Sequence, residues 1–282
     1  MNQKEKRRHL FRVFLKSKGL FACFSIVLSL LLVVGSTYAW ITSADERVNR
    51  ADANQRKVAA FVVEDFKQVF HWAPGTTKEK NIRVQNTGEA PALVRISLKE
   101  YFVGFETNET DNHNNQDGNG NLKVYGTPPP GSTMIDVKDT ATWAIGNTYT
   151  VSASKYYQAD TALVNRTYLY KGARTEPLPK IILNFQAGKV FDATTPPGSG
   201  DSDYWYYEKG FFYYSEVLQP GDETPNLLDS ISLDTTYANQ YKGAIYKLVP
   251  EMDAHDLTKE LLTSWGITSG DYVRTLYQDK LH

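Results

Sequence analysis

The sequence predicts an all-β protein: an antiparallel jelly-roll-type β-sandwich with a short C-terminal helix and long loops. Turn and strand signals alternate between residues 72 and 98, where Pro74-Gly75 forms a turn and Ile82 and Val84 alternate with polar residues. Asn86-Thr87-Gly88 supplies the next turn, and alternate residues from Ala92 to Leu98 form an apolar face of a second strand. An aromatic content of 13% supplies material for a core.

The N-terminal residues have the pattern of a signal peptide. Seven Lys/Arg side chains between residues 4 and 18 precede an apolar stretch from Leu20 to Val34, which is short for a transmembrane helix. The small residues Thr37 and Ala39 then have the spacing that a signal peptidase recognises, so we expect cleavage before Trp40 and contact with the membrane only before processing. The alternative is a permanent N-terminal anchor.

Cleavage at Ala39 changes the composition of the chain. Cys23, the only cysteine, lies near the start of the apolar stretch, where a lipobox cysteine would not be placed, and would be removed. Seven of the 31 basic and one of the 32 acidic residues are also removed, which leaves 24 basic and 31 acidic residues and a net charge of −7. This charge disfavours nucleic-acid binding, and stability must come from core packing without disulfides.

Residues 40–57 would form an N-terminal arm. Ser43-Ala44-Asp45-Glu46 matches a capping box, but the polar run to Lys57 has almost no apolar stripe. The arm is therefore a short solvated helix or a flexible segment, or else a segment that is ordered by a neighbouring subunit.

Residues 58–282 are expected to form one sandwich domain with loop insertions at about 104–131 and 188–203. The apolar run from Val58 to Phe66 reads as a strand buried on both faces. The polar residues 108–121 include Asp111 and Asp117, which faintly resemble a calcium loop without its final Glu, so an exposed loop without metal or other cofactor is the favoured interpretation.

Further elements follow in the second half. Strands are predicted at 142–145, 149–151, 168–170, 180–185 and 246–250. The aromatic runs of residues 204–214 are expected to form a hairpin that packs into the core or, alternatively, a carbohydrate platform. Asp253 is expected to cap a helix that ends near Gly266.

Several of these motifs resemble one family. The turn Trp72-Ala73-Pro74-Gly75, the turn Asn86-Thr87-Gly88 and the strand start Val94-Arg95 are similar to those of the TasA and camelysin family of Gram-positive exported proteins, and residues 204–233 resemble its clostridial members. The Gly-x-Thr-aromatic-Ala segment before Trp40 resembles signals cut by the SipW-type peptidase.

The resemblance implies a secreted structural protein of a biofilm matrix or cell-surface fibre. Fibres of this family grow when the N-terminal segment of one subunit completes a sheet of the next, so Trp40 and Ile41 would begin a donor strand, and the partners would be other copies of the chain and related matrix proteins. A cell-wall or carbohydrate-binding module is the alternative.

An enzyme is not expected. Camelysin-like proteins have been classed as metallopeptidases, but the mature chain has only His71, His113, His255 and His282, with no His-Glu-x-x-His pair for zinc. A Gly-x-Ser-x-Gly elbow and a cysteine nucleophile are missing as well.

Overall fold

The computed structural model describes residues 58–65, 75–108, 121–236, 241 and 243–282. These residues belong to one compact unit, residues 54–282. The described strands are β1 (Ala60–Asp65), β2 (Thr77–Asn86), β3 (Leu93–Phe105), β4 (Thr148–Ser152), β5 (Lys155–Thr167), β6 (Ile181–Phe185), β7 (Val190–Phe191), β8 (Trp205–Glu208), β9 (Phe211–Tyr214), β10 (Leu228–Leu233) and β11 (Ile245–His255). The helices are two 3-10 turns, η2 (Thr140–Thr142) and η3 (Leu178–Lys180), and two short α-helices, α3 (Glu260–Ser264) and α4 (Tyr272–Tyr277).

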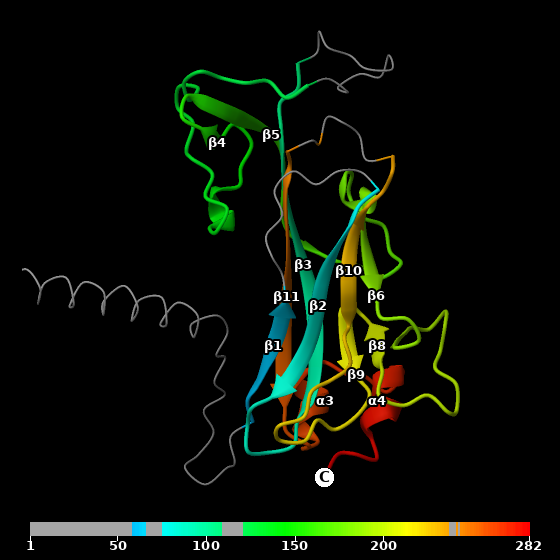
Figure 1. Ribbon diagram of the computed structural model, residues 1–282. Coiled ribbons are helices and arrows are strands. Elements are labelled where there is room, and N and C mark those ends of the chain that lie inside the picture. The colour runs from blue at the N-terminus through cyan, green and yellow to red at the C-terminus, as the bar shows by residue number, and fades with distance from the viewer. Residues whose placement is uncertain (1–57, 66–74, 109–120, 237–240, 242) are drawn as a thin grey trace, which may run out of the picture. The chain divides into compact units, whose positions relative to one another are not determined.

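The described strands form two sheets that pack as a sandwich (Figure 1). One sheet has the order β1-β2-β10-β6, and the other has the order β4-β5-β3-β9-β8-β7, with β11 on the free side of β3. All pairings are antiparallel except β7 with β8. The predicted all-β sandwich with helix at its C-terminal end is confirmed, and the pairs β2–β10 and β3–β11 join distant parts of the chain, as jelly rolls do.

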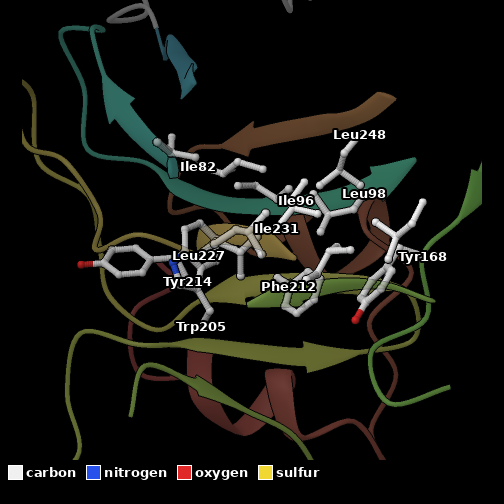
Figure 2. Close-up of a cluster of buried hydrophobic side chains, with 14 of the residues drawn as sticks. Ile82, Ile96, Leu98, Tyr168, Trp205, Phe212, Tyr214, Leu227, Ile231 and Leu248 are labelled. Carbon is white, nitrogen blue, oxygen red and sulfur yellow. The ribbon is translucent and has the colours of Figure 1, made fainter. Parts of the chain in front are cut away.

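Strand β3 lies inside the larger sheet, and both of its faces are covered. Val94, Ile96 and Leu98 have no exposed surface and face the core between the sheets, as the alternation predicted (Figure 2). On the opposite face, Leu93 belongs to a second cluster with residues of α3 and α4. The C-terminal helices therefore cover the outside of the larger sheet.

The aromatic hairpin is part of the core. Strands β8 and β9 are joined at Lys209-Gly210, both with positive φ, which suits a tight hairpin turn. Trp205 and Phe212 have no exposed surface, and the Trp205 indole donates a hydrogen bond to the carbonyl of Pro225 (3.1 Å). The core interpretation of residues 204–214 is confirmed.

Two predicted strands are wrong. Around Thr142, the chain forms η2 because the Asp139 carboxylate accepts a hydrogen bond from the Ala141 amide (3.0 Å). Residues 168–170 follow the end of β5, where the Gly172 amide bonds the carbonyl of Leu169 (3.0 Å) and Lys171 has a φ of 55°. In both places a local turn outweighs the β-propensity of the aromatic residues.

Asp253 does not cap a helix. It lies in β11, opposite Arg95 of β3, and its carboxylate binds the Arg95 guanidinium, so the strand continues to His255. The predicted helix is α3, which is shorter than expected, and α4 follows it.

Other boundaries also shift. The run beginning at Val58 is the edge strand β1, whose Phe61 side chain is 43% exposed, so burial on both faces was wrong. Strand β3 extends to Phe105, and the segment 188–203 contains the short strand β7.

Candidate assembly site

The turn after β2 holds the beginning of β1. The amides of Thr87 (2.9 Å) and Gly88 (2.8 Å) both donate to the carbonyl of Ala59. The turn is itself fixed by Asn86, whose side chain has no exposed surface: its amide group donates to the carbonyls of Ala90 (2.9 Å) and Leu218 (2.8 Å), and its oxygen accepts from the Gly88 amide (2.9 Å). The motif thus fixes the point at which the chain enters the sandwich.

A distant segment covers the opposite side of β2. The Gly221 amide donates to the carbonyl of Asn86 (2.8 Å), and the Thr224 amide donates to the carbonyl of Val84 (2.9 Å). The Thr224 hydroxyl in turn accepts from the Val84 amide (3.0 Å). The Asn86-Thr87-Gly88 turn and the distant segment 218–224 therefore meet at β2.

Strand β1 ends the smaller sheet. It pairs with β2 in a regular antiparallel register from Ala60 opposite Asn86 to Asp65 opposite Asn81. The backbone groups of Asn86 and Val84 bond the segment on the far side of β2, so their partners Ala60 and Val62 turn their own amides and carbonyls away from β2. No described strand pairs with this outer edge, although β1 contacts β11.

The side chains of β1 have a core face and an outer face. Val58, Ala60 and Val62 pack against the core between the sheets, whereas Phe61 is exposed on the outer face. The start of β1 is thus anchored by side chains and by the turn at Asn86, while its outer edge has no strand partner among the described residues.

The other motif residues occupy separate places. Gly75 has a φ of 76°, and its amide donates to the carbonyl of Leu233 (2.9 Å). Val94 lies in the core, and Arg95 lies on the opposite face of β3, where its guanidinium stacks on Phe211 (4.0 Å to the ring centroid) and Trp265 (4.8 Å). Thr37, Ala39, Trp40, Ile41, Trp72, Pro74, Asp111 and Asp117 lie outside the described residues.

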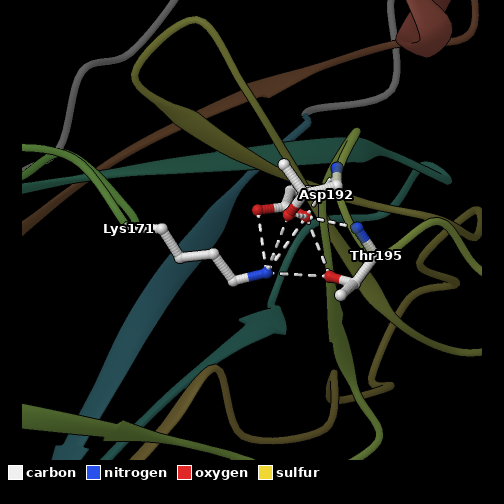
Figure 3. A network of polar contacts seen from close by, with 4 residues as sticks. Lys171, Asp192 and Thr195 are labelled. Atoms are coloured by element: carbon white, nitrogen blue, oxygen red, sulfur yellow. Dashed lines mark hydrogen bonds and ion pairs between the residues drawn. The ribbon is translucent and has the colours of Figure 1, made fainter.

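Sequence reasoning missed a polar network at the loop before β8 (Figure 3). The Asp192 carboxylate accepts from the backbone amides of Thr194 (3.0 Å) and Thr195 (2.8 Å) and pairs with the Lys171 ammonium (3.0 Å). Burial alone would raise the pKa of Asp192, but hydrogen bonds from Thr194, Lys171 and Thr195 outweigh it and hold the pKa well below its usual range. The Asp-x-Thr-Thr pattern of an Asx turn was its signal in the sequence.

A second network is buried at the middle of β3. Glu100, which is 1% exposed, forms an ion pair with Arg174 and accepts from the Tyr246 hydroxyl (2.9 Å). Arg174 also donates to the carbonyl of Ile181 at the start of β6 (2.8 Å). Burial raises the pKa of Tyr246, so the hydroxyl stays protonated and donates to the carboxylate. This network joins the two sheets.

Strand β2 also has a buried lysine. Lys80 is 2% exposed and points to the same side as Ile82 and Val84. Burial, with a smaller contribution from Lys247, lowers the pKa of Lys80 from 10.5 to about 7.

None of the helices formed by the described residues is long and apolar enough to span a bilayer. Those residues bring no three His, Cys, Asp or Glu side chains together as metal ligands.

Comparison with family models, curated proteins and solved structures finds no match for this chain.

Proposed function

We propose that the chain is a secreted structural protein of the TasA and camelysin type, which assembles into extracellular fibres of a biofilm matrix or cell surface. Residues 1–39 would be removed by a SipW-type signal peptidase, and residues 40–57 of one subunit would add a strand to the next subunit, head to tail. The observation that carries the proposal is the outer edge of β1, which pairs with no strand of the described residues; β1 is the strand that directly follows this arm.

The edge supplies the physical reason for assembly. Unpaired amides and carbonyls on an edge strand accept another strand, and proteins that stay monomeric usually block such edges. A head-to-tail contact uses two different surfaces of each subunit, so it propagates instead of closing. The arm also begins with the apolar pair Trp40-Ile41.

The carbohydrate-binding alternative has less support. A sugar platform needs exposed aromatic rings, but Trp205, Tyr206, Phe212, Tyr213 and Tyr214 are all buried. Their burial favours a packing function for this cluster.

The test compares two purified chains, one beginning at Trp40 and one at Val58. The longer chain should form filaments visible by negative-stain microscopy and should sediment as a polymer. The shorter chain should be a folded monomer, with folding checked by circular dichroism. Identical sedimentation of the two chains would contradict the proposal, and retention of both on purified wall polysaccharide would support the binding alternative.

A further inference from the structure

Strand β8 faces the start of α4 with alternate side chains. Tyr206 and Glu208 lie in β8, and Tyr204 directly precedes it. The Glu208 carboxylate accepts hydrogen bonds from the backbone amides of Tyr272 (3.1 Å) and Val273 (3.1 Å). Because amides in the first turn of a helix have no partner within the helix, this carboxylate satisfies them and fixes Tyr272 against β8.

The ring of Tyr272 lies against the ring of Tyr206. Their centroids are 4.2 Å apart and their planes are inclined at 31°, which brings ring carbons of the two side chains into van der Waals contact. The hydroxyl oxygen of Tyr272 also lies 3.4 Å from that of Tyr204. By comparison, the rings of Tyr170 and Tyr207 are 5.5 Å apart and inclined at 55°. Tyr206 and Tyr272 are thus held in the closer and flatter arrangement.

One ring of this pair is buried and the other is accessible. Tyr206 is 3% exposed and belongs to the cluster between the larger sheet and the C-terminal helices, whereas Tyr272 packs against that cluster and is only partly buried. Burial raises the pKa of Tyr206, so its hydroxyl group stays protonated at neutral pH. A reagent in solution therefore reaches the pair through Tyr272, while the sheet and helix shield Tyr206 from other chains.

From this geometry we infer that Tyr206 and Tyr272 form a site of oxidative modification, at which a peroxidase with hydrogen peroxide joins the two rings as dityrosine within one chain. Each phenol gives up one electron and its hydroxyl proton. The two radicals then form a carbon–carbon bond between ring carbons that neighbour the hydroxyl-bearing carbons, and each of these carbons passes its hydrogen, as a proton, to the oxygen of its own ring. The two electrons and two protons lost overall reduce one hydrogen peroxide to two waters.

The cross-link joins β8 to α4 in a chain that has no cysteine after residue 39 and so no disulfide there. The bond closes the segment 206–272 into a loop, which restricts the unfolded chain and stabilises the fold as a disulfide does. Because this modification concerns the single subunit, the inference goes beyond the proposed function and does not depend on fibre assembly.

The test treats the chain beginning at Trp40, as a dilute monomer, with a purified peroxidase and hydrogen peroxide. Equal amounts of unlabelled chain and chain labelled with a heavy nitrogen isotope are mixed before oxidation. Trypsin should release residues 190–209 and 260–274 as separate peptides, and mass spectrometry detects their cross-linked pair by the loss of two hydrogen atoms. A bond within one chain joins peptides of the same label, whereas a bond between chains also gives mixed-label pairs.

We expect same-label pairs alone, because the two rings are already in contact within the fold. Tyr206→Phe and Tyr272→Phe should each abolish the cross-link, since phenylalanine keeps the ring but cannot form a phenoxyl radical. Tyr204→Phe should retain it, and so should Tyr170→Phe, the matched control from the more distant tyrosine pair. The cross-linked chain should also unfold at a temperature several degrees higher than the untreated chain.

Circular dichroism checks that each variant is folded. Absence of the cross-linked pair from the native sequence, or mixed labels at the frequency of random pairing, would overturn the inference. Retention of the cross-link in folded Tyr272→Phe would do so as well. Loss in Tyr204→Phe with retention in Tyr206→Phe would show that the stacked pair is not the site.

Discussion

Asn86 shows how a single side chain fixes the entrance to the sandwich. Two of its side-chain hydrogen bonds, with Gly88 and Ala90, close the turn after β2. The third links this turn to the carbonyl of Leu218, which lies 132 residues later. Such a buried amide costs little while it is satisfied, but its partners lose their bonds when it is removed. We therefore expect the stability of the β1–β2 pair to depend on this residue.

Asn86→Ala should lower the free energy of unfolding by about 3 kcal/mol, because it leaves the buried carbonyl of Leu218 without this donor and opens the turn that holds Ala59. Urea denaturation of the chain beginning at Val58 measures the change. Asn86→Asp is the matched control: it keeps the acceptor for Gly88 but loses both donors. A loss below about 0.5 kcal/mol for Asn86→Ala would show that the turn is held by its backbone alone.

Lys80 gives the molecule a pH-dependent stability. Its folded pKa of about 7 lies below the unfolded value of 10.5, so between these values the unfolded chain binds more protons and stability rises with pH. Above about pH 10 the trend should reverse, because burial raises the pKa of Tyr168, Tyr204 and Tyr214 in the fold.

The free energy of unfolding, measured by urea denaturation from pH 7 to pH 9.5, should therefore increase for the native sequence, with a slope of at most about 1.4 kcal/mol per pH unit. Lys80→Met should remove this increase because it removes the titrating amine. Lys78→Met, two residues earlier on β2 and less buried, should retain it. A slope unchanged in Lys80→Met would contradict the assignment to this lysine.

At the scale of elements, Arg95 connects the C-terminal helices to the larger sheet. Its guanidinium contacts Phe211 of β9 and Trp265 at the end of α3, and it pairs with Asp253 of β11 (3.0 Å). It also donates to the carbonyl of Trp265 (3.3 Å). A planar guanidinium can stack and donate at the same time, which an ammonium cannot do in this geometry.

Arg95→Lys should therefore destabilise the fold by about 1–2 kcal/mol. Arg83→Lys is the control, because the Arg83–Glu223 pair (2.8 Å) is more exposed and should contribute less than about 1 kcal/mol. Thermal unfolding followed by circular dichroism measures both variants. Equal effects would mean that the ring contacts of Arg95 contribute nothing measurable.

The elements that the sequence predicted well depend on local patterns. The β8–β9 hairpin and β2 have their turn residues and alternation within a few positions, and β6 begins one residue from its predicted start. Strand β5 was missed because its Ala, Gln, Asp and Asn residues have low β-propensity, and pairing with β3 and β4 overrides it. Asp253 was misassigned because its partner Arg95 is 158 residues away.

At the scale of the whole molecule, the sequence predicted the sandwich, which the structure confirms, and an N-terminal arm that lies outside the described residues. The position of β1 at the end of the smaller sheet could be found only from the three-dimensional strand pairing. The run from Val58 was apolar enough to suggest a central strand, and its position at the end of the sheet depends on the β2–β10 register.

Assembly as proposed requires one subunit to donate its N-terminal arm as a strand to another. A synthetic peptide of residues 40–57, added to the chain beginning at Val58 and, separately, to growing filaments, measures this donation. We expect one peptide bound per chain by calorimetry and an arrest of filament growth, neither of which a scrambled peptide of the same composition should produce. Filaments that grow unaffected in excess peptide, with no binding to the shorter chain, would contradict strand donation.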